Sequence, residues 1–129
     1  MNNKPPTLPK ALLVLSSRPW NQAIADRLAR SLNRHVEVIS SPEQLKPETI
    51  AEINPQWIFV PHWSHLIPES IWDNWPTVIF HMTDLPFGRG GSPLQNLIIR
   101  NIKKTKLSAF RMTNELDAGP IYLKETLDL

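Results

Sequence analysis

The sequence of 129 residues contains no cysteine and only four glycines. Without cysteine there can be no disulfide bonds, thiolate metal sites or cysteine nucleophiles, and this composition fits a cytoplasmic protein. The sequence has neither an apolar run long enough to span a bilayer nor a signal-peptide core, so no membrane association is expected. A net charge of +2, with scattered lysines and arginines, gives no reason to expect a nucleic-acid partner.

The composition and the order of apolar runs favour one globular α/β domain. Hydrophobic residues make up 41% of the chain and charged residues 20%. Residues 1–10 are polar and proline-rich and are predicted to be a disordered tail, which leaves residues 11–129 as a single domain. Strands are expected at residues 11–17, 35–40, 57–61, 77–81, 106–112 and 120–129. Helical patterns between them predict an open, mostly parallel sheet with helices on both faces.

Two local patterns, apolar spacing and a capping box, predict helices. Apolar residues at four-residue spacing predict a helix that packs one face on the sheet, and most of the five tryptophans are expected in the core. That face comprises Trp20, Ile24, Leu28 and Leu32. Ser41 with Gln44 forms a capping-box pattern for a second helix, which Pro47 breaks or restarts. Residues 48–53 are expected to be the main part of this second helix, and further helices are expected at residues 69–75 and 93–100.

Three of the four glycines lie in the stretch FHMTDLPFGRGGSPLQNLI, residues 80–98, directly after the fourth predicted strand. In open parallel sheets, ligands bind beyond the carboxyl ends of the strands, so this loop has the position of a binding site. A phosphate loop would need lysine and serine or threonine after the last glycine, whereas Gly91 is followed by Ser92 and Pro93. Two interpretations remain open: a loop that presents helix amides to a polar group, or a turn that needs positive φ angles.

The histidines raise the alternative of a metal site. His62 and His65 have H-x-x-H spacing, and His81 with Asp84 has H-x-x-D spacing. Prolines bracket the first pair in a loop, where no helix would fix the ligand geometry, so we do not predict a metal.

Three motifs in order resemble the folate-dependent formyltransferases. HMTDLPFGRGGSPLQNLI resembles their H-P-S-L-L-P-x-x-R-G-x-x-P-x-x-x-x-I segment, TNELDAGPIY is similar to their L-D-x-G loop, and SHLIP to a turn that ends in L-x-P. The resemblance covers residues 57–123 and implies a Rossmann-like fold. It also implies transfer of a formyl group from 10-formyltetrahydrofolate to the amine of a small molecule, for which an amino sugar is one candidate.

The resemblance assigns roles residue by residue. His81 and Asp117 take the positions of the catalytic histidine and aspartate. The folate would lie against Trp63, His65, Leu66, Asn114, Glu115 and Leu116. The amine substrate would lie along Arg89, Gly90, Gly91 and Ser92.

The sequence departs from the family in two ways. Ile79 occupies the position of an asparagine that donates a hydrogen bond to the reacting oxygen, so a catalytically silent domain that keeps the pocket is the alternative. Thr83 and Arg89 are candidates for a substitute donor. The sequence ends ten residues after Gly119, which makes the domain short at its C-terminus compared with the family. We therefore expect a homo-oligomer to cover the shortened sheet edge.

Overall fold

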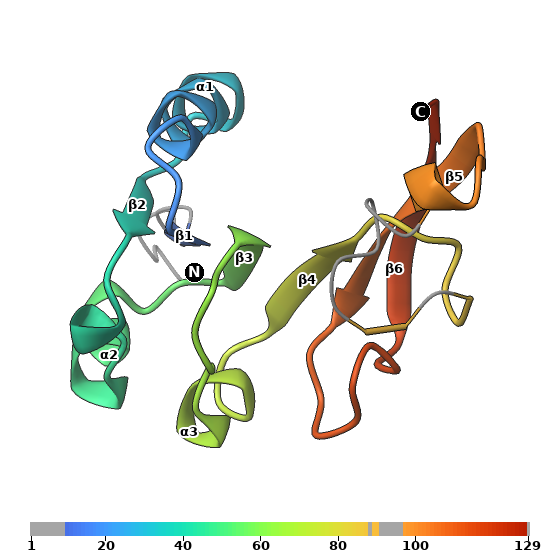
Figure 1. Ribbon diagram of the computed structural model, residues 1–129. Coiled ribbons are helices and arrows are strands. Elements are labelled where there is room, and N and C mark those ends of the chain that lie inside the picture. The colour runs from blue at the N-terminus through green and yellow to red at the C-terminus, as the bar shows by residue number, and fades with distance from the viewer. Residues whose placement is uncertain (1–9, 88, 91–96, 129) are drawn as a thin grey trace, which may run out of the picture.

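The computed structural model describes residues 10–87, 89–90 and 97–128 (Figure 1). A six-stranded sheet has the order β2-β1-β3-β4-β5-β6. The strands are β1 (Leu12–Ser16), β2 (Val36–Ile39), β3 (Trp57–His62), β4 (Thr77–His81), β5 (Lys104–Arg111) and β6 (Ile121–Asp128). The pairings among β2, β1, β3 and β4 are parallel, and β5 and β6 add antiparallel pairings. The predicted mostly parallel α/β sheet is confirmed.

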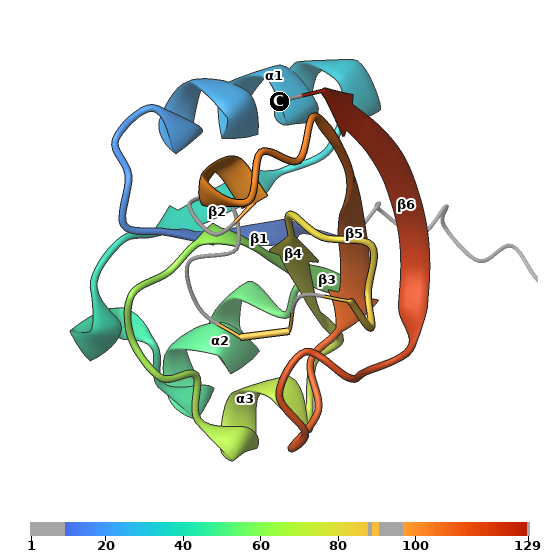
Figure 2. The ribbon, with the colours of Figure 1, turned by 45° about the vertical axis from the view of Figure 1, so that its right-hand side comes forward.

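Helices cover both faces of the sheet, as predicted. Helix α1 (Asn21–Leu32) lies on one face, and α2 (Pro47–Ile53) and α3 (Glu69–Trp72) lie on the other (Figure 2). Residues 97–99 are helical, and the start of the helix expected at 93–100 falls outside the described residues. The expected tail also lies outside them, except for Lys10. None of the helices in the described part of the chain has the length and hydropathy that a bilayer crossing requires.

The main core lies between the sheet and helices α2 and α3. Successive side chains of a strand point to opposite faces, so alternate residues of β1 and β3 enter this core. Its buried members are Leu13, Leu15, Ile39, Leu45, Ile50, Ile58, Val60, Ile67 and Ile71. The intervening residues Leu12, Val14 and Phe59 line an apolar cavity of about 420 Å³ under α1.

The structure corrects the expected packing of the first helix. Trp20 precedes α1 instead of lying within it, and its side chain is 56% exposed. Ile24 and Leu32 line the cavity under α1 but remain about half exposed. The residues of α1 that become fully buried are Asn21 and Ala25. Four-residue spacing placed the helix correctly, yet it carried no information on how closely the helix approaches the sheet.

The capping-box prediction is wrong. Ser41 makes no side-chain cap hydrogen bond, and its carbonyl oxygen instead accepts the Gln44 amide of a short 3-10 helix, Pro42–Gln44. Proline restricts the residue before it to extended conformations, and Lys46 is extended with φ −123° and ψ 145°. The chain therefore leaves the first turn and begins α2 at Pro47.

Candidate active site

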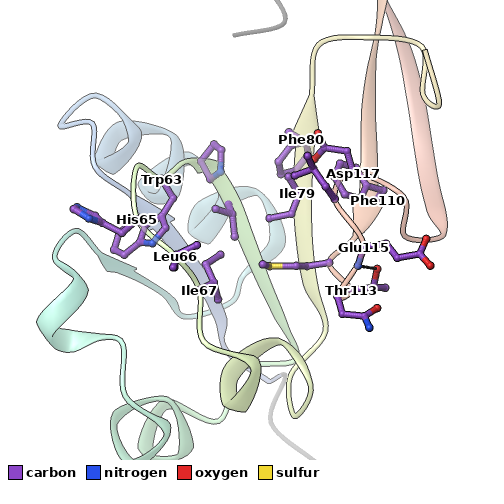
Figure 3. A pocket seen from close by; sticks show the side chains of 15 residues that line it. Trp63, His65, Leu66, Ile67, Ile79, Phe80, Phe110, Thr113, Glu115 and Asp117 are labelled. Carbon is purple, nitrogen blue, oxygen red and sulfur yellow. Dashed lines mark hydrogen bonds between the residues drawn. The ribbon is translucent and has the colours of Figure 1, made fainter. Parts of the chain in front are cut away.

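A cavity of about 400 Å³ opens beyond the carboxyl ends of β3 and β4. The loop after β3 forms one side, and β4, β5 and the loop between β5 and β6 form the other (Figure 3). This is the edge where open parallel sheets bind ligands. The lining residues are Val60, Pro61, Trp63, His65, Leu66, Ile67, Ile79, Phe80, Phe110, Met112, Thr113, Asn114, Glu115, Leu116 and Asp117. All six residues expected at the folate are therefore in one cavity.

His81 and Asp117 meet beside this cavity, although they are 36 residues apart (117 − 81). The Nδ1 atom of His81 lies 3.8 Å from Oδ2 of Asp117, and the two side chains are only 7% and 13% exposed. At this separation water does little to screen the carboxylate from the imidazole. The fold thus brings the two expected catalytic residues into one poorly solvated contact.

Two hydrogen-bonded ties join the segment around Arg89 to the loop that carries Asp117. The backbone amide of Gly90 donates to Oδ2 of Asp117 at 2.8 Å. The Nε and Nη2 atoms of Arg89 both donate to the carbonyl oxygen of Leu116, at 2.8 and 2.6 Å. Arg89 and Gly90, expected at the amine substrate, therefore also position the aspartate. Gly91 and Ser92 lie outside the described residues.

Glycine is required at two points of this arrangement, for different reasons. Gly90 has φ +109°, a conformation that side-chain-bearing residues rarely adopt. A Cβ atom at Gly119 would lie 1.7 Å from the carbonyl oxygen of Arg111, so this position admits no side chain. The glycine of the L-D-x-G motif thus lets the aspartate loop return closely against β5.

Asp117 itself adopts a left-handed backbone, with φ +50°. Aspartate tolerates this region better than most residues because its short polar side chain can form local hydrogen bonds. The carboxylate is thereby turned toward Gly90 and His81.

Ile79 lies in the cavity wall, where the family pattern has a hydrogen-bond donor. It pairs with Phe110 of β5, so this part of the wall is apolar. Neither proposed substitute is among the described lining residues: Thr83 is 1% exposed, and Arg89 is bonded to Leu116. The structure therefore does not bring either of them to the side of the cavity where Ile79 lies.

The mouth of the cavity is apolar on both sides. Leu66, from the loop after β3, is 93% exposed, and Leu116, from the opposite loop, is 67% exposed. Trp63 packs edge-on to His65 with ring centroids 5.7 Å apart. Its Nε1 atom is buried and has no hydrogen-bond partner within the described structure. A buried donor without an acceptor is uncommon in folded proteins.

Residues that sequence reasoning missed hold the segment after His81 in place. Ser108 of β5 donates to the carbonyl oxygen of Thr83 at 2.7 Å. Lys124 of β6 forms a 2.5 Å ion pair with Asp84 and donates to the carbonyl oxygen of Leu85 at 2.8 Å. These contacts depend on the pairing of distant strands. No local motif marks Ser108 or Lys124.

The residues considered above as possible metal ligands contact other side chains. His62 faces Asn21, His65 packs on Trp63, and Asp84 pairs with Lys124. Within residues 10–87, 89–90 and 97–128, no three histidine, aspartate or glutamate residues form a group that could hold a metal ion.

Comparisons with known proteins agree with the fold. No protein-family model matches the chain. Methionyl-tRNA formyltransferase of Rickettsia prowazekii (strain Madrid E) is 30% identical over 96% of this chain and 46% of its own length. That of Sulfurovum sp. (strain NBC37-1) is 33% identical over 67% of this chain and 30% of its own length. The structure of methionyl-tRNA formyltransferase from Clostridium thermocellum has a TM-score of 0.87 and 43% identity, covering 92% of this chain and 53% of that protein.

More distant structures share the fold alone. HypX from Aquifex aeolicus, in complex with tetrahydrofolic acid, has a TM-score of 0.72 at 24% identity, covering 92% of this chain and 21% of that one. Phosphoribosylglycinamide formyltransferase from Bacillus halodurans has a TM-score of 0.71 at 15% identity, covering 93% and 80%.

The mostly parallel six-stranded sheet with its helices matches the fold of these formyltransferases. With these relatives, the chain belongs to the formyltransferase family. It spans less than half the length of these two curated relatives, 30% and 46%.

Proposed function

We propose that this chain transfers a formyl group from 10-formyltetrahydrofolate to the amine of a small molecule. The observation that carries the proposal is the contact of His81 with Asp117 beside a cavity of about 400 Å³. Formyl transfer needs a proton-handling pair next to a pocket that holds a flat, largely apolar donor. The contact and the cavity supply these two parts.

His81 would act on the oxygen of the formyl group. When the acceptor nitrogen attacks the formyl carbon, negative charge develops on this oxygen, and a hydrogen bond from the imidazole would stabilise it. Since the His81 side chain is only 7% exposed, that interaction would be stronger than the same contact in water.

Asp117 would hold the imidazole and manage the proton of the amine. One bond forms between the acceptor nitrogen and the formyl carbon, and the bond from that carbon to the donor nitrogen breaks. The proton that leaves the acceptor must reach the donor nitrogen. A carboxylate held by the Gly90 amide, 3.8 Å from His81, is positioned to carry it.

The cavity fits a folate-type ring. Its walls include Ile67, Ile79 and Met112, and a volume of about 400 Å³ lies within the range of small-molecule sites. The tetrahydrofolic acid bound by HypX, which shares the fold, supports the same ligand class.

The acceptor that we favour is an amino sugar, approached by residues 89–92. Nε and Nη2 of Arg89 donate to the carbonyl oxygen of Leu116. Its Nη1 group would donate a hydrogen bond to a polar substituent of the acceptor.

One observation favours a second candidate, a catalytically silent domain that keeps the pocket. Ile79 presents an apolar wall where the family has a donor, and loss of one such donor typically costs about two to three orders of magnitude in rate. This domain would bind folate without transferring its formyl group.

The deciding experiment measures transfer of a labelled formyl group from 10-formyltetrahydrofolate to a panel of amino sugars and to glycinamide ribonucleotide. We expect transfer that disappears in His81→Ala, while calorimetry shows that this variant still binds folate. Folate binding without transfer to any acceptor would contradict the enzyme and favour the silent domain.

A further inference from the structure

A second group of polar side chains lies at the carboxyl ends of β1 and β3, outside the cavity described above. The side-chain amide nitrogen of Asn21 lies 2.5 Å from Oγ of Ser16 and 3.1 Å from Nδ1 of His62. Asn21 is 1% exposed and Ser16 is also 1% exposed, whereas His62 is exposed. A buried amide thus holds a solvent-facing imidazole.

The hydrogen bonds of this cluster determine which nitrogen of His62 carries its proton. Ser16 has one hydroxyl proton, which it donates to the carbonyl oxygen of Arg18 at 3.2 Å. Oγ of Ser16 also accepts from the backbone amide of Arg18 at 3.0 Å, and the NH₂ group of Asn21 faces it. With this orientation of the Asn21 amide, Nδ1 of His62 accepts and the neutral ring carries its proton on Nε2.

An exposed aromatic surface adjoins this imidazole. The ring of Trp20 meets that of His62 edge-on, with centroids 6.0 Å apart, and the Arg18 guanidinium lies 5.6 Å from the Trp20 ring centre. These neighbours hold the indole in place, yet 56% of Trp20 remains exposed. Trp20 thus presents an aromatic surface to solvent beside the imidazole of His62.

The cluster lies at the same edge of the sheet as His81. Ser16 of β1 pairs with His62 of β3. In β3 and β4 the last paired residues are Val60 and Ile79, and His62 and His81 each lie two residues beyond them. Both histidines therefore belong to the carboxyl edge of the sheet, beyond the paired part of β3 and β4.

The cluster also marks a change of direction in the sheet. From β1 the chain crosses to β2 on one side, while β3 lies on the other side. Such a switch point between two strands is where open α/β sheets leave a crevice for ligands. The folate cavity, by contrast, lies toward β4 and β5.

We propose that Trp20 and His62 form the subsite for the ring of the formyl acceptor, a proposal that rests on the function proposed above. Trp20 would pack against the C–H face of a sugar ring. The Nε2–H group of His62 would donate to the oxygen on the carbon next to the amine-bearing carbon. A ring with an apolar face and a hydroxyl beside its amine is the chemistry that this pair recognises.

The test compares two acceptors that differ in the recognised hydroxyls: glucosamine and cyclohexylamine. His62→Phe keeps a ring beside Trp20 but removes the donor, so the preference in kcat/KM for glucosamine should fall about tenfold, as expected for one lost hydrogen bond. His62→Gln, which retains an N–H donor, should keep most of the preference. Trp20→Leu should raise KM for both acceptors alike, because it removes the platform and no hydrogen bond.

Binding without turnover gives an independent readout. Millimolar glucosamine should shift the ¹⁵N resonances of the Trp20 indole and the His62 ring, and His62→Phe should weaken this binding about tenfold. Trp72→Phe, in α3 on the opposite face, is the matched control and should leave binding unchanged. The tautomer assignment requires the Nε2 resonance of free His62 to be the protonated one.

The outcomes separate this subsite from the proposed function. Formyl transfer that is unaffected by both Trp20→Leu and His62→Phe overturns the subsite and leaves the function standing. Glucosamine-induced shifts at Trp20 and His62 without transfer to any amine support the subsite and overturn the function. If glucosamine shifts neither residue, the subsite is wrong.

Discussion

The Asp117 carboxylate lies 3.8 Å from the imidazole of His81 and also accepts a 2.8 Å hydrogen bond from the backbone amide of Gly90. The amide fixes one carboxylate oxygen and leaves its charge next to the imidazole. The position of the pair therefore depends on the backbone as much as on the two side chains.

Replacing Asp117 by Asn should lower kcat by about two to four orders of magnitude, the usual contribution of a proton-transfer group. Asparagine can still accept from the Gly90 amide, so the loop should keep its conformation while the charge is lost. The measurement is single-turnover formyl transfer. Glu125→Gln, an exposed change in β6 away from the cavity, should leave the rate unchanged. Equal rates for Asp117→Asn and the unchanged protein would exclude a proton-transfer role.

Replacing Ile79 by Asn should raise the rate of formyl transfer about tenfold or more, because it restores a donor to the cavity wall. Ile79→Leu is the control for altered packing and should not raise the rate. Ile79 packs against the main core, so thermal unfolding of both variants must be compared. A folded Ile79→Asn variant no faster than Ile79→Leu would mean that the donor is not limiting.

Replacing Gly119 by Ala should destabilise the domain by about 3 kcal/mol, because the new Cβ would collide with the backbone of Arg111. Gly90→Ala meets nothing within 4 Å and should cost less, about 1–2 kcal/mol for its positive φ. Urea denaturation followed by circular dichroism measures both. The reverse order of stabilities would show that the aspartate loop does not approach β5 as described.

Replacing Lys124 by Met should loosen the segment after His81 without unfolding the domain. The pair with Asp84 is partly exposed, so its loss should cost less than about 1 kcal/mol, corresponding to about fivefold faster local opening. Hydrogen exchange at the Phe87 amide, which bonds Asp84, is the measurement. Lys124→Arg should restore slow exchange. Unchanged exchange in Lys124→Met would indicate that contacts other than those of Lys124, such as those of Ser108 and Thr105, hold the segment.

The expected homo-oligomer stays a prediction. Strand β6 is the last strand in the sheet order, and Ile121, Tyr122 and Leu123 are 44%, 44% and 58% exposed. Size-exclusion chromatography with light scattering should detect a dimer that Leu123→Lys disrupts, since lysine on an edge strand opposes association. A stable monomer at all concentrations would contradict it.

Local patterns in the sequence predicted the order of strands and helices well. Short apolar runs and four-residue spacing depend only on nearby residues, and β1, β3 and β4 appear where these patterns place them. The exposure of Trp20 and the missing cap at Ser41 were not predictable in this way. The exposure of Trp20 depends on how closely α1 approaches the sheet, whereas the missing cap follows from Pro47, which keeps Lys46 extended.

The candidate site was predictable where a motif defines it. His81, Asp117 and the folate-side residues came from a family resemblance, and the fold brings them together. The ties from Arg89 to Leu116 and from Ser108 to Thr83 join residues 27 and 25 positions apart. Such contacts leave no spacing pattern in one sequence. Asn21 and His62, 41 residues apart, were missed for the same reason.

The bonds from Arg89 and Gly90 to the aspartate loop have a kinetic consequence. Arg89 and Gly90, expected at the amine, should move together with the loop that carries Leu116 and Asp117, expected at the folate and at the reacting centre. Neither segment can shift without breaking hydrogen bonds to the other. Substitutions that alter the KM for one substrate should therefore alter the KM for its co-substrate, and saturation with either should change the apparent affinity for the other. A change in specificity for the amine should therefore be accompanied by a change in specificity for the folate.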